Sequence, residues 1–321
     1  MRLLSIHACF LSAGLMLGAA GLAHSQNFPV KPIRIVASQV GGAGDIAARV
    51  IAQGISGPLG QPVIVDNRGG GVIPASYVSK AQPDGYTVLF HGSSLWLLPF
   101  MRDNLPWDPL RDFAPITLAI TSANLVVVHP AQPINSIKDL IAVAKARPGQ
   151  LNDAGGQTGA SSHLASELFK AMAGVDIVRV PYKGVGPALN ALVAGEVQLS
   201  FTNPGAAAPH VKSGRLRALA VTSAQPSALL PGLPTVAASG LPGYEAVSIF
   251  GMFAPAKTPA AIINRLNLEI ARHLKAPETR ERFLNSGVET VGSPPEQLGT
   301  TIKAEMARMG KVIRDRGIRA E

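Results

Sequence analysis

Two glycine-rich segments could bind an anion through their backbone, because each joins an apolar strand to the start of a predicted helix. In the first segment, the residues expected to reach a ligand are Ser38, Gln39, Gly41, Gly42 and Asp45. The N–H groups in the first turn of a helix have no partner within the helix, and the helix dipole adds positive potential there. Such a turn is predicted to bind a carboxylate. The alternative is a purely structural turn in which Asp45 caps the helix.

The second segment has the same character and carries more hydroxyl groups. It follows the predicted strand 151–154 and consists of Gln157, Thr158, Gly159, Ala160, Ser161, Ser162 and His163. Ordinary capping by Ser161 or Thr158 is the structural alternative and needs only one of these residues. Hydrolysis by Ser162 with His163 is disfavoured, because neighbours in a helix do not face one another and no G-x-S-x-G elbow occurs. We therefore expect a second anion-binding helix start.

Further polar residues lie where predicted strands end, which is where open α/β sheets bind ligands. They are Ser93, Ser94, Tyr182, Thr202 and Asn203. The histidines after residue 25 have no partner at metal-ligand spacing, and Cys9 is the single cysteine. The sequence therefore predicts neither a metal site nor a cofactor.

The first glycine-rich segment also allows a different reading, as a nicotinamide-dependent oxidoreductase. Gly42-x-Gly44-x-x-Ala47 is spaced like a dinucleotide fingerprint, and Asp66 ends the next predicted strand, where a ribose-binding acid would stand. However, Gln39 and Val40 lengthen the connection from strand to glycine. We keep this activity as the alternative function.

The first 25 residues have the composition of a secretory signal peptide. Arg2 precedes an apolar run over 8–23, and Ala23-His24-Ser25 forms a small-x-small cleavage site. The run is shorter than the roughly 20 residues that a membrane span requires. We expect residues 1–25 to be cleaved on export and the protein to reach the periplasm.

The length, composition and charge narrow the class of protein. The 321 residues are 47% hydrophobic and 15% charged, which favours about two well-packed domains. The net charge is +9, but the basic residues are scattered and few aromatic residues lie among them, so no nucleic-acid surface is expected. Apolar strands alternate with amphipathic helices, which predicts an α/β fold with parallel or mixed sheets.

Capping residues indicate where several helices begin and end. Asn135-Ser136 is predicted to cap a helix, and Gly174 to end the helix that follows the second glycine-rich segment. Thr258-Pro259 is expected to open another helix. Ser293 with Glu296 fits a capping box for the C-terminal helix.

Taken in order, many short segments of the chain resemble the solute-binding proteins of tripartite tricarboxylate transporters, the Bug-type receptors. The likeness covers the chain after the leader and includes 28–34, 66–68, 83–87, 112–115, 146–149, 161–164, 180–184, 217–222, 234–236 and 240–244.

The resemblance implies a two-lobed periplasmic binding protein of the Venus-flytrap type. One lobe would comprise 27–124 and 222–321, the other 125–221, with two crossing strands near Leu125 and Thr222. A small carboxylate, such as a di- or tricarboxylate or an aromatic acid, would be held between the two glycine-rich segments. The implied protein is a monomer, not an enzyme, and delivers its ligand to transporter subunits. A receptor-like domain that signals to a sensor partner is a further alternative.

The sequence departs from the family pattern near the expected ligand. Ser38-Gln39-Val40 replaces the aromatic residue and prolines that usually precede the glycine pair, and Thr202 replaces an acid. These departures predict additional polar contacts from the first segment to the ligand, and a ligand without an amino group.

Overall fold

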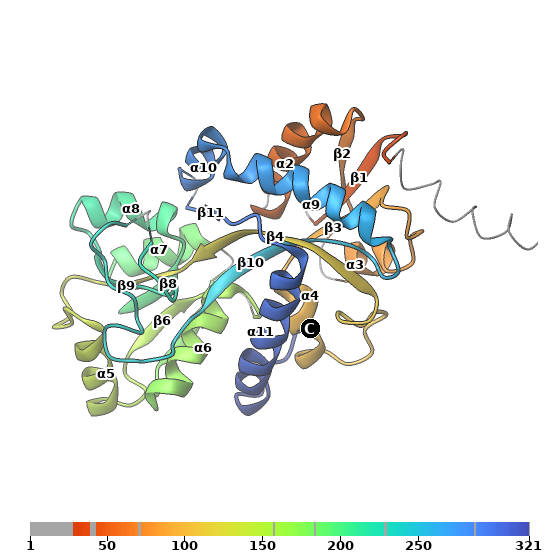
Figure 1. The fold of residues 1–321 in the computed structure, drawn as a ribbon. Helices are drawn as coiled ribbons and strands as arrows, with labels where there is room; N and C mark the ends of the chain where they lie inside the picture. Colours follow the sequence, from red (N-terminus) through yellow and green to blue (C-terminus); the bar gives the residue numbers. More distant parts are fainter. Residues whose placement is uncertain are drawn as a thin grey trace, which may run out of the picture.

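The structure of the protein is a computed structural model that describes residues 28–38, 43–69, 72–156, 158–182, 184–227, 230–285 and 287–320. Helices and two mixed β-sheets build two lobes, which lie side by side in Figure 1. The predicted α/β, two-lobed fold is confirmed. The predicted signal peptide lies outside the described residues.

The first lobe is built on a six-stranded sheet. The strand order is β11 (Glu289–Thr290), β4 (Phe113–Ala123), β10 (Val247–Pro255), β3 (Thr87–Gly92), β1 (Ile33–Ala37) and β2 (Val63–Asn67). Strand β1 pairs in parallel with β2 and β3, whereas β10 runs antiparallel to β3 and β4. Strand β10, from the C-terminal part of the chain, therefore lies between β4 and β3, which come from its N-terminal half.

Helices cover both faces of this sheet. One face packs against α2 (Ala43–Leu59), α9 (Ala260–Lys275) and α10 (Pro277–Leu284). The other face carries α3 (Ile73–Val78), α4 (Ser94–Leu97), the 3-10 turn η1 (Leu98–Phe100) and the long C-terminal helix α11 (Pro295–Asp315). The apolar stripe of α11, with Leu298, Ile302 and Met309 buried, faces the sheet because these residues recur at helical spacing.

The second lobe is built on a five-stranded sheet. Its order is β7 (Val178–Pro181), β6 (Asn152–Gly155), β8 (Leu199–Thr202), β5 (Leu125–Val128) and β9 (Arg217–Val221). Helices α5 (Ile137–Ala146) and α6 (Ser161–Ala173) pack on one face. Helices α7 (Val185–Val193) and α8 (Pro204–Lys212) pack on the other.

The chain passes between the lobes at a junction of three residues. Asn124 separates β4 from β5, and Thr222 follows β9. The Thr222 hydroxyl accepts from the Asn124 N–H at 2.7 Å and donates to the Ala246 carbonyl at 2.6 Å. Beyond Thr222, the chain first packs back on the second lobe, where the Val236 N–H donates to the Val221 carbonyl at 2.9 Å. It then enters β10 after Ala246, so the return crossing lies there rather than directly at Thr222.

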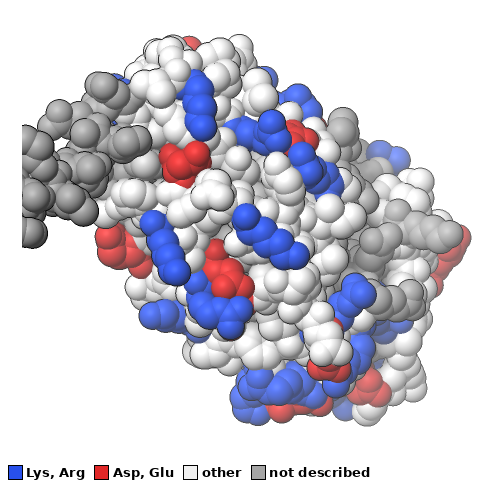
Figure 2. All heavy atoms as spheres, turned by 90° about the vertical axis from the view of Figure 1, so that its right-hand side faces the viewer, with Lys and Arg blue, Asp and Glu red and all other residues white. Residues whose placement is uncertain are grey.

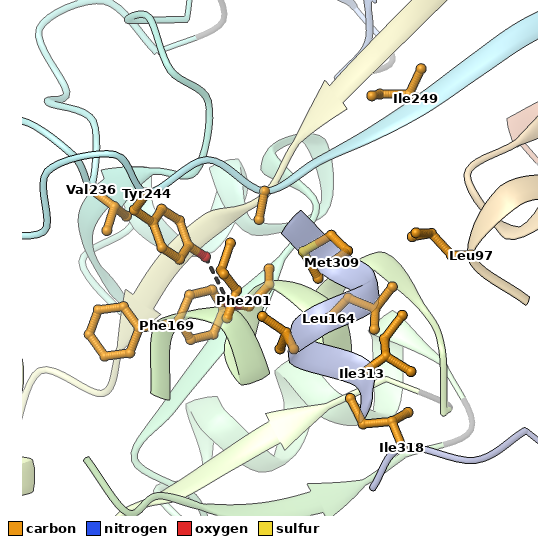
Figure 3. Packing of buried hydrophobic residues seen from close by; sticks show 14 of the residues in the cluster. Leu97, Leu164, Phe169, Phe201, Val236, Tyr244, Ile249, Met309, Ile313 and Ile318 are labelled. Carbon is orange, nitrogen blue, oxygen red and sulfur yellow. Dashed lines mark hydrogen bonds between the residues drawn. The ribbon is translucent and has the colours of Figure 1, made fainter. Parts of the chain in front are cut away.

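A single apolar core continues from one lobe into the other. Leu164 and Phe169 of α6 belong to the same buried cluster as Met309 and Ile313 of α11 (Figure 3). The Tyr244 hydroxyl donates to the Ala165 carbonyl at 2.8 Å within this cluster. Burial of this much apolar surface holds α6 against α11.

The predicted caps have different outcomes. The Ser136 side chain accepts from the Asp139 N–H, and Gly174 ends α6 in the left-handed conformation, as predicted. The capping box at Ser293 was wrong, because Pro294 is the N-cap of α11 and makes no side-chain cap bond. The Ser293 hydroxyl instead accepts from the Leu118 N–H at 3.0 Å and thereby joins α11 to β4.

The charge pattern on the surface agrees with the scattered basic residues of the sequence. On the face in Figure 2, Lys and Arg lie among acidic and uncharged side chains and form no continuous stripe. Within the described ranges, no helix combines the length and the apolar character needed to span a membrane.

The junction yields a stability prediction. Thr222→Val removes the hydroxyl and leaves the Asn124 N–H buried without its acceptor, so we expect a loss of about 1–3 kcal/mol in the free energy of unfolding. Urea denaturation measures the effect. Thr222→Ser keeps the hydroxyl and should lose clearly less; equal losses in the two variants would contradict the role of these hydrogen bonds.

Candidate functional site

The start of α6 leaves its first amides without an internal cap. The N-cap residue is Ala160, in an extended conformation with φ −64° and ψ 155°, and among the described residues no side chain caps the helix. The N–H groups of Ser161, Ser162 and His163 are therefore the helical donors that lack intrahelical acceptors. The predicted caps Ser161 and Thr158 do not fill this role. The helix start is free to bind an anion.

Close packing shapes the loop that leads to this helix start. A Cβ at Gly156 would lie 2.5 Å from the Ser162 hydroxyl oxygen, so a side chain there would displace this hydroxyl. Gly159 has a left-handed φ of 79°, and its N–H donates to His163 Nδ1 at 3.0 Å. Arg179 Nη2 donates to the Gly156 carbonyl at 2.6 Å. These contacts orient the backbone between β6 and α6.

The ring of His163 is an acceptor rather than a cation. Burial, together with the nearby Arg179 charge, lowers the pKa of His163 to about 4. At neutral pH the imidazole is uncharged, which agrees with Nδ1 accepting the Gly159 amide. His163 therefore fixes the loop and supplies no positive charge to a ligand.

A cavity of about 460 Å³ opens between the lobes at the start of α6; we call it the interlobe cavity. Its walls come from β4 and β10 of the first lobe and from β6, α6, α7 and β8 of the second. Polar groups include Ser122, Asn124, Thr202, Asn203 and Ser248, and most other lining residues are apolar. The described residues that line it include no charged side chain. Its chemistry suits a small molecule with an apolar body and hydrogen-bonding groups.

A second cavity of about 240 Å³ adjoins the first; we call it the side cavity. The two share Ala160, Ser161, Ser248 and Phe250, so the start of α6 faces both. Its remaining polar lining consists of Ser38, His91, Ser93, Ser94, Glu305 and Arg308.

Phe250 forms the aromatic wall common to the two cavities. Its ring stacks on Phe90 with centroids 5.9 Å apart and an interplanar angle of 13°. A Cβ at Gly44 or Gly92 would lie 3.2 or 3.1 Å from this ring, so glycine at both positions allows the close approach. Phe250 thus places an aromatic face in the cleft, although the chain has Ser38 where the family pattern usually has an aromatic residue.

The predicted site residues fall into three groups. Those that line one or both cavities are Ser38, Ser93, Ser94, Gly159, Ala160, Ser161, Ser162, Thr202 and Asn203. Those that line neither are Asp45, Thr158, His163 and Tyr182. Gln39, Gly41, Gly42 and Gln157 lie outside the described residues. Their contacts with a ligand stay a prediction.

Asp45 has a structural role in the first lobe. Its buried carboxylate accepts from Asn67 Nδ2 at 2.9 Å and pairs with Arg49 Nε at 2.9 Å. Asn67 Nδ2 also donates to the Ser38 carbonyl at 2.8 Å. Asp45 lies in the first turn of α2, not at its N-cap, and helps to hold the ends of β1 and β2 together.

Sequence reasoning missed the contributions of β4, β10 and α11. Ser122, Ser248, Phe250 and Glu305 line the cavities, yet none of them belongs to a glycine-rich turn. One signal was present for Glu305, which lies three residues after Ile302 and four before Met309, on the apolar face of α11. An acid at such a position is rarely buried without a purpose.

Glu305 is the most perturbed carboxyl in the cavity walls. Burial raises the pKa of Glu305 to about 7, although hydrogen bonds from Trp96 and Ser93 and the Arg308 charge oppose the shift. Trp96 Nε1 donates to Glu305 Oε2 at 2.7 Å. Near neutral pH the group therefore exists in both protonation states.

Comparison with known proteins points to one family. The profile of the family described as "Tripartite tricarboxylate transporter family receptor" matches residues 47–318. Protein BugT of Bordetella pertussis is 36% identical over 325 residues, which cover 98% of each chain.

Two solved structures with bound carboxylates are similar over most of the chain. R. palustris Rpa4515 with adipate has a TM-score of 0.74 and 37% identity, covering 91% of this chain and 99% of that one. MatC (Rpa3494) from Rhodopseudomonas palustris with bound malate has a TM-score of 0.70 and 28% identity, covering 89% and 100%. The nicotinamide-dependent alternative finds no support in these likenesses.

The raised pKa of Glu305 predicts a pH effect on stability. Between the ordinary value of 4.5 and about 7, the folded state binds more protons than the unfolded state, so stability falls as pH rises through this window. Relative to Glu305→Gln, the wild type should lose on the order of 3 kcal/mol between pH 4 and 8.

Urea unfolding of both proteins at several pH values measures this difference. Burial also raises the pKa of Asp153, to about 6, but that group is present in both proteins and cancels in the comparison. A wild-type-to-variant difference that does not change with pH would refute the assignment.

Proposed function

Since the chain belongs to the tripartite tricarboxylate transporter receptor family, we propose that it binds a small carboxylate between its two lobes and presents it to a membrane transporter. The family consists of transporter receptors. The ligand class and the delivery step are our proposal for this chain.

The observation that carries the proposal is the uncapped start of α6, which faces both cavities. A carboxylate oxygen there would accept from amides that no described side chain caps, and the helix dipole favours its charge. Hydroxyl groups of Ser161, Thr202 and Ser248 line the same space. A binder needs no catalytic group for this task, so we propose a receptor without enzymatic activity.

The energies are sufficient for micromolar affinity, which requires about 8 kcal/mol. Charge-assisted hydrogen bonds contribute about 1.5–3 kcal/mol each, and a helix terminus up to about 2 kcal/mol when partly buried. Burial of an apolar ligand body against Phe250 adds roughly 25 cal/mol per Å². Several such bonds offset the cost of ordering the ligand. The bound adipate and malate of the two similar structures support a carboxylate as the ligand.

The proposal extends to location and domain organisation. The leader over residues 1–25 supports export to the periplasm with cleavage, and we propose that the mature protein acts as a monomer. The predicted lobe boundaries, 27–124 with 222–321 and 125–221, stay a prediction with one change: we propose that the segment between Thr222 and Ala246 belongs to the second lobe, because the Val236 N–H donates to the Val221 carbonyl.

Calorimetric titration of the exported protein tests the function. We expect one or more small carboxylates to bind with micromolar or better affinity, and the matched primary amides of the same acids to bind at least 10-fold more weakly. Turnover of the bound acid is not expected. Failure of all di- and tricarboxylates and aromatic acids to bind would refute the proposal.

An Asp at position 160 should occupy the anion site from within. Because Ala160 already has the extended conformation of an N-cap, Ala160→Asp should cap α6, raise the free energy of unfolding by about 0.5–2 kcal/mol and reduce carboxylate affinity at least 10-fold. Urea unfolding and titration measure the two effects.

Ala160→Asn is the matched control, because it caps the same amides without a charge. It should also weaken carboxylate binding, but less than Ala160→Asp. If both variants bind carboxylates as the wild type does, the amides of α6 are not the anion site.

A further inference from the structure

The side cavity contains a buried carboxyl group that the proposed carboxylate anchor does not use. Glu305 is 6% exposed and projects from α11 into a space that also reaches Ser161 at the start of α6. A ligand anchored at α6 can therefore extend a substituent toward Glu305 without leaving the site. Its neighbours on the same face of α11, Leu298, Ile302 and Met309, are apolar.

Glu305 is held through one oxygen only. Oε2 accepts from Trp96 Nε1 at 2.7 Å and from the Ser93 hydroxyl at 3.4 Å. Among the residues that the structure describes, none donates to Oε1. The Trp96 indole N–H can only donate, so it holds Oε2 toward the indole and leaves Oε1 without a donor. The carboxyl is thus positioned with a free acceptor atom.

His91 also lines the side cavity. Its Nδ1 lies 3.2 Å from the Gly92 carbonyl, which places the ring proton on Nδ1 and leaves Nε2 as an acceptor. In the described part of the chain, Nε2 is buried without a hydrogen-bond partner. Burial lowers the pKa of His91, so the ring is neutral. The His91 ring therefore brings no positive charge to the side cavity.

The positive charge nearby is already balanced. Arg308, on the same helix, donates through Nη1 to Glu245 Oε2 at 3.0 Å. On α6, which packs against α11, Glu167 pairs with Arg316 at 2.9 Å and also with Lys170. These pairs leave Glu305 as the acid of the side cavity that has no ion-pair partner among the described residues.

We propose that the side cavity is a specificity pocket for a hydrogen-bond donor on the bound carboxylate, a hydroxyl or ammonium group, and that Glu305 accepts this donor through Oε1. The pocket deepens the proposed function and rests on it, because the ligand is anchored by its carboxylate at α6. The sequence predicted a ligand without an amino group, because Thr202 on β8 stands where the family usually has an acid. In the proposed pocket, Glu305 on α11 supplies an acid instead, so an amino group can be accepted.

The environment of the pocket favours a donor over a second carboxylate. A donor that approaches Oε1 restores a hydrogen bond that a buried carboxylate has lost on leaving water. A second carboxylate would face the Glu305 charge, and Arg308 would have to leave Glu245 to compensate. An ammonium group would gain the most, because it pairs with an ionised acid in a desolvated site.

Titration of ligands that share a carbon skeleton provides the test. Hexanoate, 6-hydroxyhexanoate and 6-aminohexanoate form one series, and succinate, malate and aspartate form another. In at least one series, we expect a donor-bearing acid to bind at least 10-fold more tightly than the unsubstituted acid. Equal affinities within every series would overturn the proposal.

Glu305→Gln identifies the residue responsible. Trp96 Nε1 requires an acceptor, so the amide oxygen of the variant takes that bond and its NH2 faces the pocket. The donor preference should then fall below 3-fold, while the unsubstituted acid binds as before or better. Glu296→Gln makes the same change in the exposed first turn of α11 and should keep the wild-type preference. An unchanged preference in Glu305→Gln would overturn the proposal.

The pH dependence of binding to the wild type is an independent test, because it does not require a variant to fold. Burial holds the pKa of Glu305 near 7, so lowering the pH from 8 to 6 protonates the acceptor. The preference for the ammonium-bearing acid over the unsubstituted acid should fall several-fold across this range. A preference that is constant with pH would count against Glu305.

The outcomes separate this proposal from the function it rests on. If no carboxylate binds, the proposed function fails. If carboxylates bind without a donor preference, only the pocket assignment fails. If a dicarboxylate is preferred and Arg308→Gln abolishes that preference, Arg308 rather than Glu305 sets specificity, and the donor pocket is refuted.

Discussion

The packing of α11 against α6 positions the whole candidate site. It buries Leu164 and Met309 in one cluster, and the ion pair of Arg316 with Glu167, at 2.9 Å, adds a polar tie. Ser161 begins one of these helices, and Glu305 lies within the other. A fixed contact between the two helices therefore fixes the distance between the first amides of α6 and the buried carboxyl. Such a core is densely packed and resists small displacements.

Much of the fold could be predicted from local signals in the sequence. The strands near 33–38, 125–128 and 216–221 are short apolar runs, and the caps at Ser136 and Gly174 have a defined chemistry. The signals failed where tertiary contacts decide the structure. Strand β10 contains Gly251 and pairs with β4 through register shifts, so its pattern does not alternate cleanly. Ser293 bonds to β4 across 175 residues of chain, a contact that no capping rule includes.

The same reasoning predicted one side of the candidate site, the start of α6, but not the opposite walls. Helix starts after strands are visible as glycine and hydroxyl residues, and this pattern led to Ala160 and Ser161. The opposite walls come from β4, β10 and the middle of α11, where no glycine-rich turn distinguishes a lining residue from its neighbours. Phe250 reads as a core aromatic, and its position against Gly44 and Gly92 depends on three distant segments. The role of Asp45 was hidden for the same reason, since Asn67 reaches it from a different strand.

The use of main-chain amides at the start of α6 affects how the ligand specificity of such a receptor can evolve. The amides proposed to bind the carboxylate belong to the main chain, so substitution by any residue other than proline leaves them in place. The side chains that meet the rest of the molecule, such as Ser122, Phe250 and Glu305, lie on β4, β10 and α11. After gene duplication, mutations in these walls can therefore change the ligand specificity, while the main-chain amides proposed to bind the carboxylate are retained.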